Sequence, residues 1–201
     1  MNRFVLIFVI VAMSGCVTIP LAQQLNCKGN KALDARNYQL AIDRYQASLI
    51  EAQKAEDRQY IAIAMYGLAR ANGYLCNFKK AEDWFLQSIA IRETLPGSSE
   101  AYLSQNILEL ARLYLSAREW DKATIQFKRA IPLVEELGVE TMDPIGYANV
   151  LEGYLDALVS VGDNAEAAQI RKKIEQLRNN PSTRMAGFKM RPYPTNCAFN
   201  K

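Results

Sequence analysis

Residues 77–88, which read NFKKAEDWFLQS, decide the fold, because the chain repeats their pattern. An earlier copy, NYQLAIDRYQAS, occupies residues 37–48, and a later copy, EWDKATIQFKRA, occupies residues 119–130. Each copy has an aromatic residue, an alanine three positions later, a second aromatic four positions after that, and a small residue three further on. In a helix the last three lie on one face, which predicts close packing against a neighbouring helix around an inserted ring.

The pattern recurs at a nearly fixed period. Ala41, Ala81 and Ala123 are 40 and 42 residues apart, and a degenerate fourth copy without the aromatics places Ala167 another 44 residues on. A small residue also stands twelve positions before each of the first three alanines, within a second apolar-periodic segment. Self-similarity at such a period predicts a solenoid of stacked helix pairs.

This pattern resembles the tetratricopeptide repeat in a form longer than the standard unit, and the resemblance covers residues 22–178. It implies an all-α, right-handed helical solenoid of about four long-form helix pairs, and the alternative is an ordinary helical bundle with chance spacing. We expect helices at about 22–35, 38–54, 58–75, 78–94, 100–117, 120–137, 144–161 and 165–178. Ser98 or Ser99 and Asp143 are expected N-caps, and Pro132 is expected to kink or loosen its helix.

The N-terminus reads as an export signal. One positive charge precedes about ten apolar residues, and Met13-Ser14-Gly15-Cys16 resembles a bacterial lipobox. This predicts a signal peptide at 1–15, lipidation of Cys16 by fatty chains and a tether at 16–21. In that family an Asp after the cysteine favours the inner membrane, so Val17 implies the periplasmic side of the outer membrane. Cleavage after Ala22 and an uncleaved anchor are the alternatives.

The composition excludes several classes of function. The 201 residues contain no histidine, which excludes a Ser/His/Asp triad and histidine metal ligation, and a net charge of +3 does not suggest nucleic acid. No nucleophile motif, phosphate-binding loop or zinc spacing occurs, so the sequence predicts a protein that is not an enzyme, with no cofactor, metal site or small-molecule substrate.

The resemblance also implies a binding groove lined by the first helix of each pair. Its positions in this chain are Asn26, Asn30, Tyr66, Arg70, Tyr74, Gln105, Leu108, Arg112, Asn149, Glu152 and Asp156.

Several groove residues have two interpretations. Asn30, Arg70, Arg112 and Asp156 occupy equivalent places and are expected to form a ladder, in which the arginines and Asn30 clamp a carboxylate. The alternative is that the arginines pair with acids of adjacent helices, such as Glu109 or Asp156. The tyrosines of the list are either anchors for a partner or partly buried packing residues.

The cysteines and the tail complete the sequence predictions. The basic, proline-containing tail at 179–201 is either a disordered end or a segment lying back along the repeats. In an oxidising compartment, Cys197 can reach Cys76 more easily than Cys27, so we expect a Cys76–Cys197 disulfide with Cys27 as a free core thiol.

The resulting hypothesis is an outer-membrane-anchored periplasmic scaffold or adaptor that binds a protein or peptide partner in the groove. One alternative is a pilotin-like assembly factor for a type IV pilus or secretion pore. A second is the regulatory subunit of an envelope hydrolase.

Overall fold

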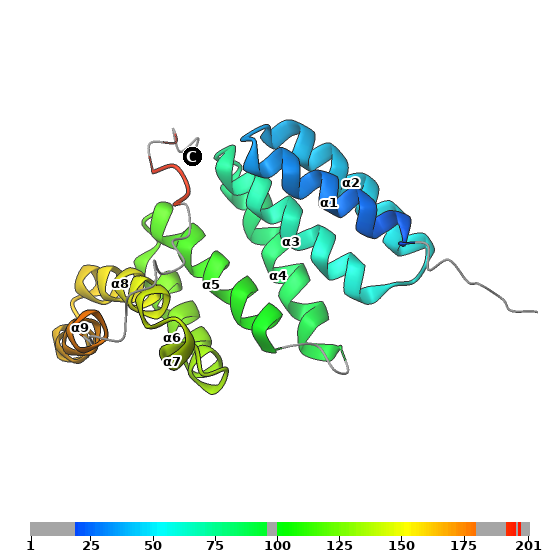
Figure 1. Ribbon diagram of the computed structural model, residues 1–201. Coiled ribbons are helices and arrows are strands. Elements are labelled where there is room, and N and C mark those ends of the chain that lie inside the picture. Colours follow the sequence, from blue (N-terminus) through cyan, green and yellow to red (C-terminus); the bar gives the residue numbers. More distant parts are fainter. Residues whose placement is uncertain (1–18, 96–99, 180–191, 196, 198–201) are drawn as a thin grey trace, which may run out of the picture.

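The computed structural model describes residues 19–95, 100–179, 192–195 and 197. Its helices are α1 (Leu21–Asp34), α2 (Tyr38–Lys54), α3 (Arg58–Tyr74), α4 (Phe78–Thr94), α5 (Glu100–Ser116), α6 (Trp120–Glu136), α7 (Val139–Met142), α8 (Pro144–Val161) and α9 (Asn164–Arg178). They follow one another as the pairs α1–α2, α3–α4, α5–α6 and α8–α9, and successive pairs stack on each other (Figure 1). The predicted all-α solenoid of four helix pairs is therefore confirmed.

Short polar side chains fix where several helices begin. Asn37, Asp57, Asp143 and Asp163 each accept a hydrogen bond from the backbone N–H three residues later, which satisfies a donor of the first turn. The observed helix bounds lie within one or two residues of those expected. The proposed caps at 98 and 99 lie outside the described residues.

One local feature differs from the sequence expectation. Helix α6 runs from Trp120 to Glu136 with Pro132 inside it, so the expected kink stays a prediction. The short helix α7 was not expected, and it occupies the connection after Gly138, whose φ of 71° is the left-handed conformation that glycine adopts easily.

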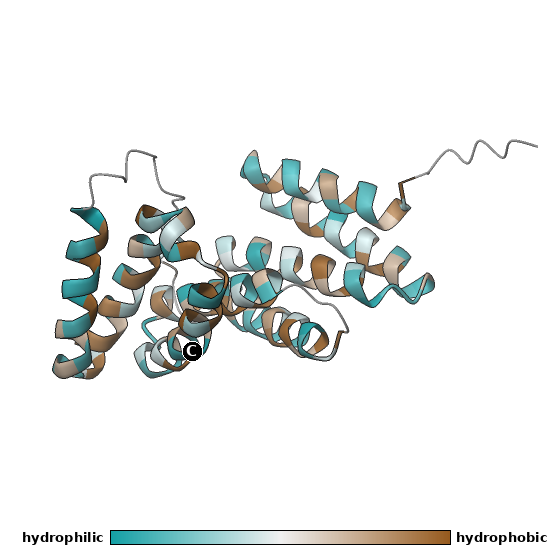
Figure 2. Ribbon diagram, turned by 60° about the horizontal axis from the view of Figure 1, so that its bottom comes forward, coloured by the Kyte–Doolittle hydropathy of each residue, from teal (hydrophilic) through white to brown (hydrophobic). Residues whose placement is uncertain are grey.

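The repeated alanines and aromatics form the core. Ala41, Ala81 and Ala123 are fully buried, and the aromatic four positions after each fills the space between helices. Tyr45 shows how tight the space is, because a Cβ added at Gly29 of α1 or at Gly67 of α3 would lie 2.5 Å from its ring. Figure 2 shows the hydrophobic residues gathered along particular sides of the helices, with hydrophilic residues along the others.

A tyrosine–glutamate–lysine unit recurs between helices. In each unit the tyrosine hydroxyl donates to the glutamate, and a lysine forms an ion pair with the same carboxylate. The units are Tyr114–Glu82–Lys122, Tyr147–Glu135–Lys173 and Tyr154–Glu166–Lys128. Burial alone would raise the pKa of Glu82 and Glu135, but the hydrogen bonds from tyrosine and lysine outweigh it and lower both. The bond from Lys128 is the main reason that the pKa of Glu166 is also lowered.

Candidate functional site

The first helices of the four pairs lie next to one another, since α1 contacts α3, α3 contacts α5 and α5 contacts α8. We call the surface formed by α1, α3, α5 and α8 the first-helix face. Two cavities open on it. The N-terminal cavity, of about 440 Å³, lies between α1, α3 and α5, and the C-terminal cavity, of about 650 Å³, lies between α5 and α8 and is bordered by α6 and α7.

The structure divides most of the predicted groove residues between these cavities. The N-terminal cavity is lined by Asn26, Asn30, Tyr66, Arg70 and Gln105. The C-terminal cavity is lined by Gln105, Leu108, Arg112, Asn149 and Glu152. Tyr74 and Asp156 line neither cavity.

The C-terminal cavity is mainly apolar. Leu115, Val134 and Val150 are among the side chains that line it, with Asn149 and Glu152 as polar groups of α8. Arg178, at the end of α9, donates to both of these polar side chains, at 3.1 Å and 2.7 Å. Such a lining suits an apolar side chain that a few polar groups hold in place.

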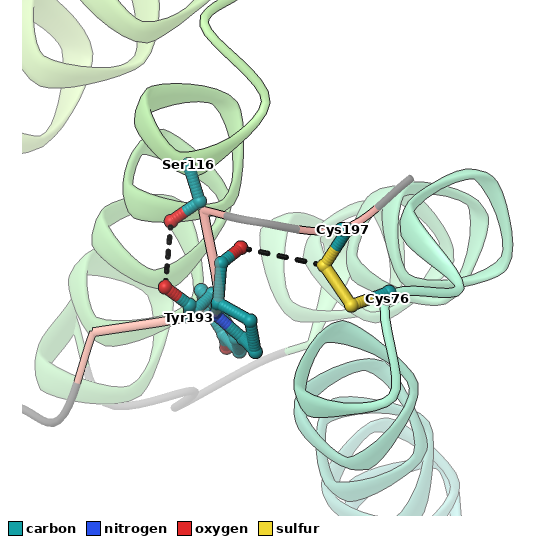
Figure 3. Close-up of a disulfide and its surroundings, with 5 residues drawn as sticks. Cys76, Ser116, Tyr193 and Cys197 are labelled. Carbon is teal, nitrogen blue, oxygen red and sulfur yellow. Dashed lines mark hydrogen bonds between the residues drawn. A yellow bond between two sulfur atoms is a disulfide. The ribbon is translucent and has the colours of Figure 1, made fainter. Parts of the chain in front are cut away.

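The described part of the tail packs against α3 and α5. Cys197 forms a disulfide with Cys76, the pairing expected from the sequence, and a Cα–Cα distance of 5.6 Å separates the two residues. Figure 3 shows Tyr193 beside α5, where its carbonyl oxygen lies 3.5 Å from Ser116 Oγ. Residues 192–195 and 197 therefore lie back on the repeats, as the second interpretation of the tail proposed.

Tyr193 is inserted between α3 and α5, and only 2% of its surface is exposed. Its ring packs on Tyr74 with 4.8 Å between centroids, and its hydroxyl donates to Glu109 Oε2 at 2.6 Å. A Cβ at Gly73 would lie 2.6 Å from the same ring, so a glycine is needed at this contact. Burial is the main cause of the raised pKa of Tyr193, which keeps its hydroxyl protonated as a donor.

The Glu109 carboxylate lies beside both groove arginines. Arg112 forms an ion pair with it at 2.9 Å, and Arg70 Nε lies 4.0 Å from the same carboxylate oxygen. Both arginines are partly buried. The expectation of a clamp open to an external carboxylate on this pair is wrong, because the internal carboxylate of Glu109 lies between them. Of the alternatives, pairing with Glu109 is the one that the structure contains.

The two groove tyrosines are packing residues. Tyr74 is 7% exposed and is stacked between Tyr38 and Tyr193, so the expectation that it is an open anchor is wrong. Tyr66 packs edge-on against Phe85 with 6.0 Å between centroids. Tyr66 also lines the N-terminal cavity, but its hydroxyl is buried and has no hydrogen-bond partner among the described residues.

The remaining predicted residues have different outcomes. Cys27 is free but exposed, so its assignment to the core is wrong: its helical position faces solvent rather than α2. Cys16, with the predicted signal peptide, lies outside the described residues. Within the part of the chain that the structure describes, no group of three potential metal ligands lies together, and no helix is long and apolar enough to cross a membrane.

Arg92 is the residue of the site that the groove pattern missed. It comes from α4, a second helix, yet it lines the N-terminal cavity and is 4% exposed. The signal was present in the sequence: Arg92 follows Ala81 by eleven positions, on the face that repeats at i, i+4 and i+7. A charged residue on a predicted core face departs from the apolar pattern expected there.

Comparisons with known proteins agree with this fold. Residues 22–94 match the family model described as Tetratricopeptide repeat. Among solved structures, the protein is similar to BtubC (BKLC) from P. vanneervenii, with 18% identity and a TM-score of 0.72 over 85% of this chain and 70% of that chain. The MamA protein is 16% identical over 85% of this chain and 98% of that chain, with a TM-score of 0.47. A search of curated proteins found no match. The repeat match indicates a protein-interaction scaffold.

Proposed function

We propose that the protein is a scaffold that holds an apolar segment of a partner protein in the C-terminal cavity of the first-helix face. The observation that carries this proposal is the cavity itself, about 650 Å³ in volume, with an apolar wall and polar groups from Gln105, Asn149 and Glu152. Apolar cavities with a few polar groups are the usual form of a binding site. Tyr193 and Glu109 occupy the neighbouring part of the first-helix face. The partner segment is therefore expected to bind next to the tail and not between the tail and the helices.

We further propose that the scaffold is attached to the periplasmic side of the outer membrane by lipid on Cys16. The lipobox-like residues 13–16 and the apolar stretch before them motivate this part of the proposal. The Cys76–Cys197 disulfide supports export, because structural disulfides persist in oxidising compartments such as the periplasm.

Site-specific photo-crosslinking in the native envelope tests the scaffold proposal. One variant carries the photo-reactive amino acid in place of Val150, in the C-terminal cavity, and a control carries it in place of Ile125, which is 61% exposed and lines neither cavity. We expect a discrete crosslinked protein from position 150 alone, and its loss when Ile145 in the cavity wall is changed to Glu. Equal crosslinking from both positions, or persistence in the Ile145→Glu variant, would refute the proposal. Mass spectrometry of the captured protein separates a general adaptor from a pilotin-like factor.

A further inference from the structure

A third cavity lies between two second helices, α2 and α4, beside the turn that follows α3. It has a volume of about 540 Å³ and shares no lining residue with the two cavities of the first-helix face. We call it the second-helix groove. Its exposed lining side chains are all polar, so their hydrogen-bonding atoms are accessible to a ligand. They are Gln39, Gln46, Asn77, Lys80, Asp83 and Gln87.

The corresponding place one copy later is filled by the protein itself. Between α4 and α6, the Tyr114 hydroxyl donates to Glu82 Oε1 at 2.8 Å, and Lys122 Nζ lies 3.3 Å from the same oxygen. Counted from the anchoring alanines, the equivalent residues one copy earlier are Asn72, Ile42 and Lys80, and all three line the second-helix groove. The lysine is kept, but the tyrosine and the glutamate are replaced by shorter or uncharged side chains. The groove therefore lacks the internal unit that closes its neighbour.

Asn77 departs from the capping seen one copy earlier. Asn37 accepts a hydrogen bond from the Leu40 N–H at the start of α2, whereas Asn77, at the same place before α4, makes no such bond. Its Nδ2 instead donates to Asn72 Oδ1 at 3.3 Å, and Asn72 Nδ2 donates to the Leu68 carbonyl oxygen at 2.8 Å. The Asn77 side-chain oxygen has no donor among the described residues. It is therefore available as an acceptor in the groove.

The lining of the groove matches a neutral ligand that both donates and accepts hydrogen bonds. Lys80 and Asp83 are its charged residues, and their charges cancel. Lys80 forms no ion pair, and the Gln46 carboxamide no hydrogen bond, within the described residues. A carboxamide offers both donors and acceptors, as a sugar hydroxyl does, so each can satisfy the other.

Trp84 adds an aromatic surface to this polar lining. It is partly exposed, and the equivalent positions of the first and third copies hold Arg44 and Gln126, so the ring is particular to this groove. The face of an aromatic ring is negative and attracts the weakly positive C–H groups on the face of a pyranose. Apart from Trp84, the apolar lining consists of Ile42, which is 8% exposed. This offers little for the side chains of a bound peptide, and the combination favours a sugar.

We propose that the second-helix groove binds a neutral saccharide. A pyranose ring packs on Trp84, and its hydroxyl groups exchange hydrogen bonds with Gln46, Asn77 and Lys80. The volume of about 540 Å³ lies within the range of small-molecule sites. The saccharide is either a free oligosaccharide or a segment of a glycan polymer. This proposal does not rest on the scaffold function, because the groove and the C-terminal cavity have separate linings.

Calorimetric titration of the full, disulfide-bonded protein tests the proposal with maltose, cellobiose, N,N′-diacetylchitobiose and, as a peptide probe, N-acetyl-trialanine amide. Co-sedimentation with peptidoglycan sacculi tests a polymer. We expect binding of at least one of these saccharides and none of the peptide. Trp84→Gln introduces the residue of the third copy, and it should weaken saccharide binding by about tenfold or more. Gln126→Ala, at the equivalent position outside the groove, should leave it unchanged.

A second variant closes the groove instead of removing its aromatic ring. Ile42→Glu together with Asn72→Tyr, beside the existing Lys80, rebuilds the tyrosine–glutamate–lysine unit of the next copy and should abolish saccharide binding. If either variant does not fold, fluorescence replaces it. Trp120→Phe leaves Trp84 as the single tryptophan of the chain, and its emission should shift on titration with the bound saccharide.

The outcomes also separate the two sources. Retention on sacculi with weaker binding of every disaccharide assigns the groove to a glycan polymer, and the reverse assigns it to a free oligosaccharide. The proposal is overturned if neither the disaccharides at millimolar concentration nor the sacculi bind. Undiminished binding by Trp84→Gln or by the closed-groove variant, an unchanged Trp84 emission, or tighter binding of the peptide would also overturn it.

Discussion

A double-mutant cycle between Gly73 and Tyr193 tests whether the tail is docked as the structure shows. Alanine is a better helix former than glycine by about 1 kcal/mol, so Gly73→Ala in α3 would ordinarily stabilise the protein. Here the new Cβ would lie 2.6 Å from Tyr193 Cε1 and 2.9 Å from its Cδ1, so the ring must leave. The sign of this single substitution therefore reports whether the ring is present.

The magnitude follows from what the ring contributes. Its hydroxyl donates to the charged Glu109, a bond that contributes about 1.5–3 kcal/mol, and burial of the ring contributes a similar amount. Losing both costs about 3–6 kcal/mol, which the helix propensity of alanine reduces to a net loss of about 2–5 kcal/mol. In a Tyr193→Ala background there is no ring to displace, and Gly73→Ala should stabilise the protein by about 1 kcal/mol.

Urea unfolding followed by far-UV circular dichroism, without reductant, measures all four proteins. We expect opposite signs for Gly73→Ala in the two backgrounds and a coupling free energy well above the 0.5 kcal/mol or so that independent sites show. If Gly73→Ala stabilises both backgrounds equally, Tyr193 does not lie against α3 and the docked tail is refuted.

Three further predictions concern the disulfide, pH and the anchor. Cys197→Ser opens a covalent loop with a sequence separation of 121, and the chain-entropy relation predicts a loss of about 5 kcal/mol of stability. Cys27→Ser is the control and should change the melting temperature little. Equal effects of the two substitutions would contradict the assigned pairing. The tyrosine–glutamate–lysine units hold the pKa values of their carboxyl groups below the ordinary 4.5. The stability that these units contribute is therefore present above about pH 4.5 and is lost as the pH falls below it. A melting temperature that does not fall between about pH 5 and 3 would contradict this. Cys16→Ser should abolish lipidation and outer-membrane fractionation, and unchanged fractionation at unchanged size would rule out the anchor.

The helix bounds could be predicted because their signals are local. The alternation of buried and exposed positions and side-chain caps such as Asp57 and Asp143 act within one or two turns, where sequence and structure are directly linked. The disulfide could be predicted for another reason: chain length and helix spacing limit which cysteines can meet. Neither argument required knowledge of side-chain partners.

The interactions of the site could not be predicted in the same way. The contact between Tyr193 and Glu109 joins residues 84 positions apart, and no pattern in the tail identifies which of its side chains is inserted. Groove positions taken from the repeat pattern gave the correct face but left two interpretations of Arg70, and only the structure shows that it lies beside Glu109 of α5. Arg92 was missed because the pattern assigns binding to first helices only.

The insertion of Tyr193 repeats a contact that the solenoid uses elsewhere. Its hydroxyl donates to a glutamate that also pairs with a cation, and Arg112 lies 5.6 Å from the centroid of its ring, as Lys122 and Lys173 lie 5.1 Å from the rings of their own units. The tail thus places a tyrosine from a non-helical segment where the other units use a tyrosine from a helix.

The contact between Tyr193 and Glu109 is more deeply buried than the three tyrosine–glutamate–lysine units. The Glu109 side chain is 4% exposed, whereas those of Glu82, Glu166 and Glu135 are 17%, 33% and 40% exposed. A carboxylate that water cannot reach depends on its protein partners for solvation, and an unmet hydrogen bond there costs more than at the surface. Because Glu109 lies between Arg70 and Arg112, loss of Tyr193 would leave the carboxylate beside these arginines without one of its hydrogen bonds. The docked tail therefore completes the hydrogen bonding of a buried carboxylate, and its removal should cost more stability than loss of the tyrosine in one of the more exposed units.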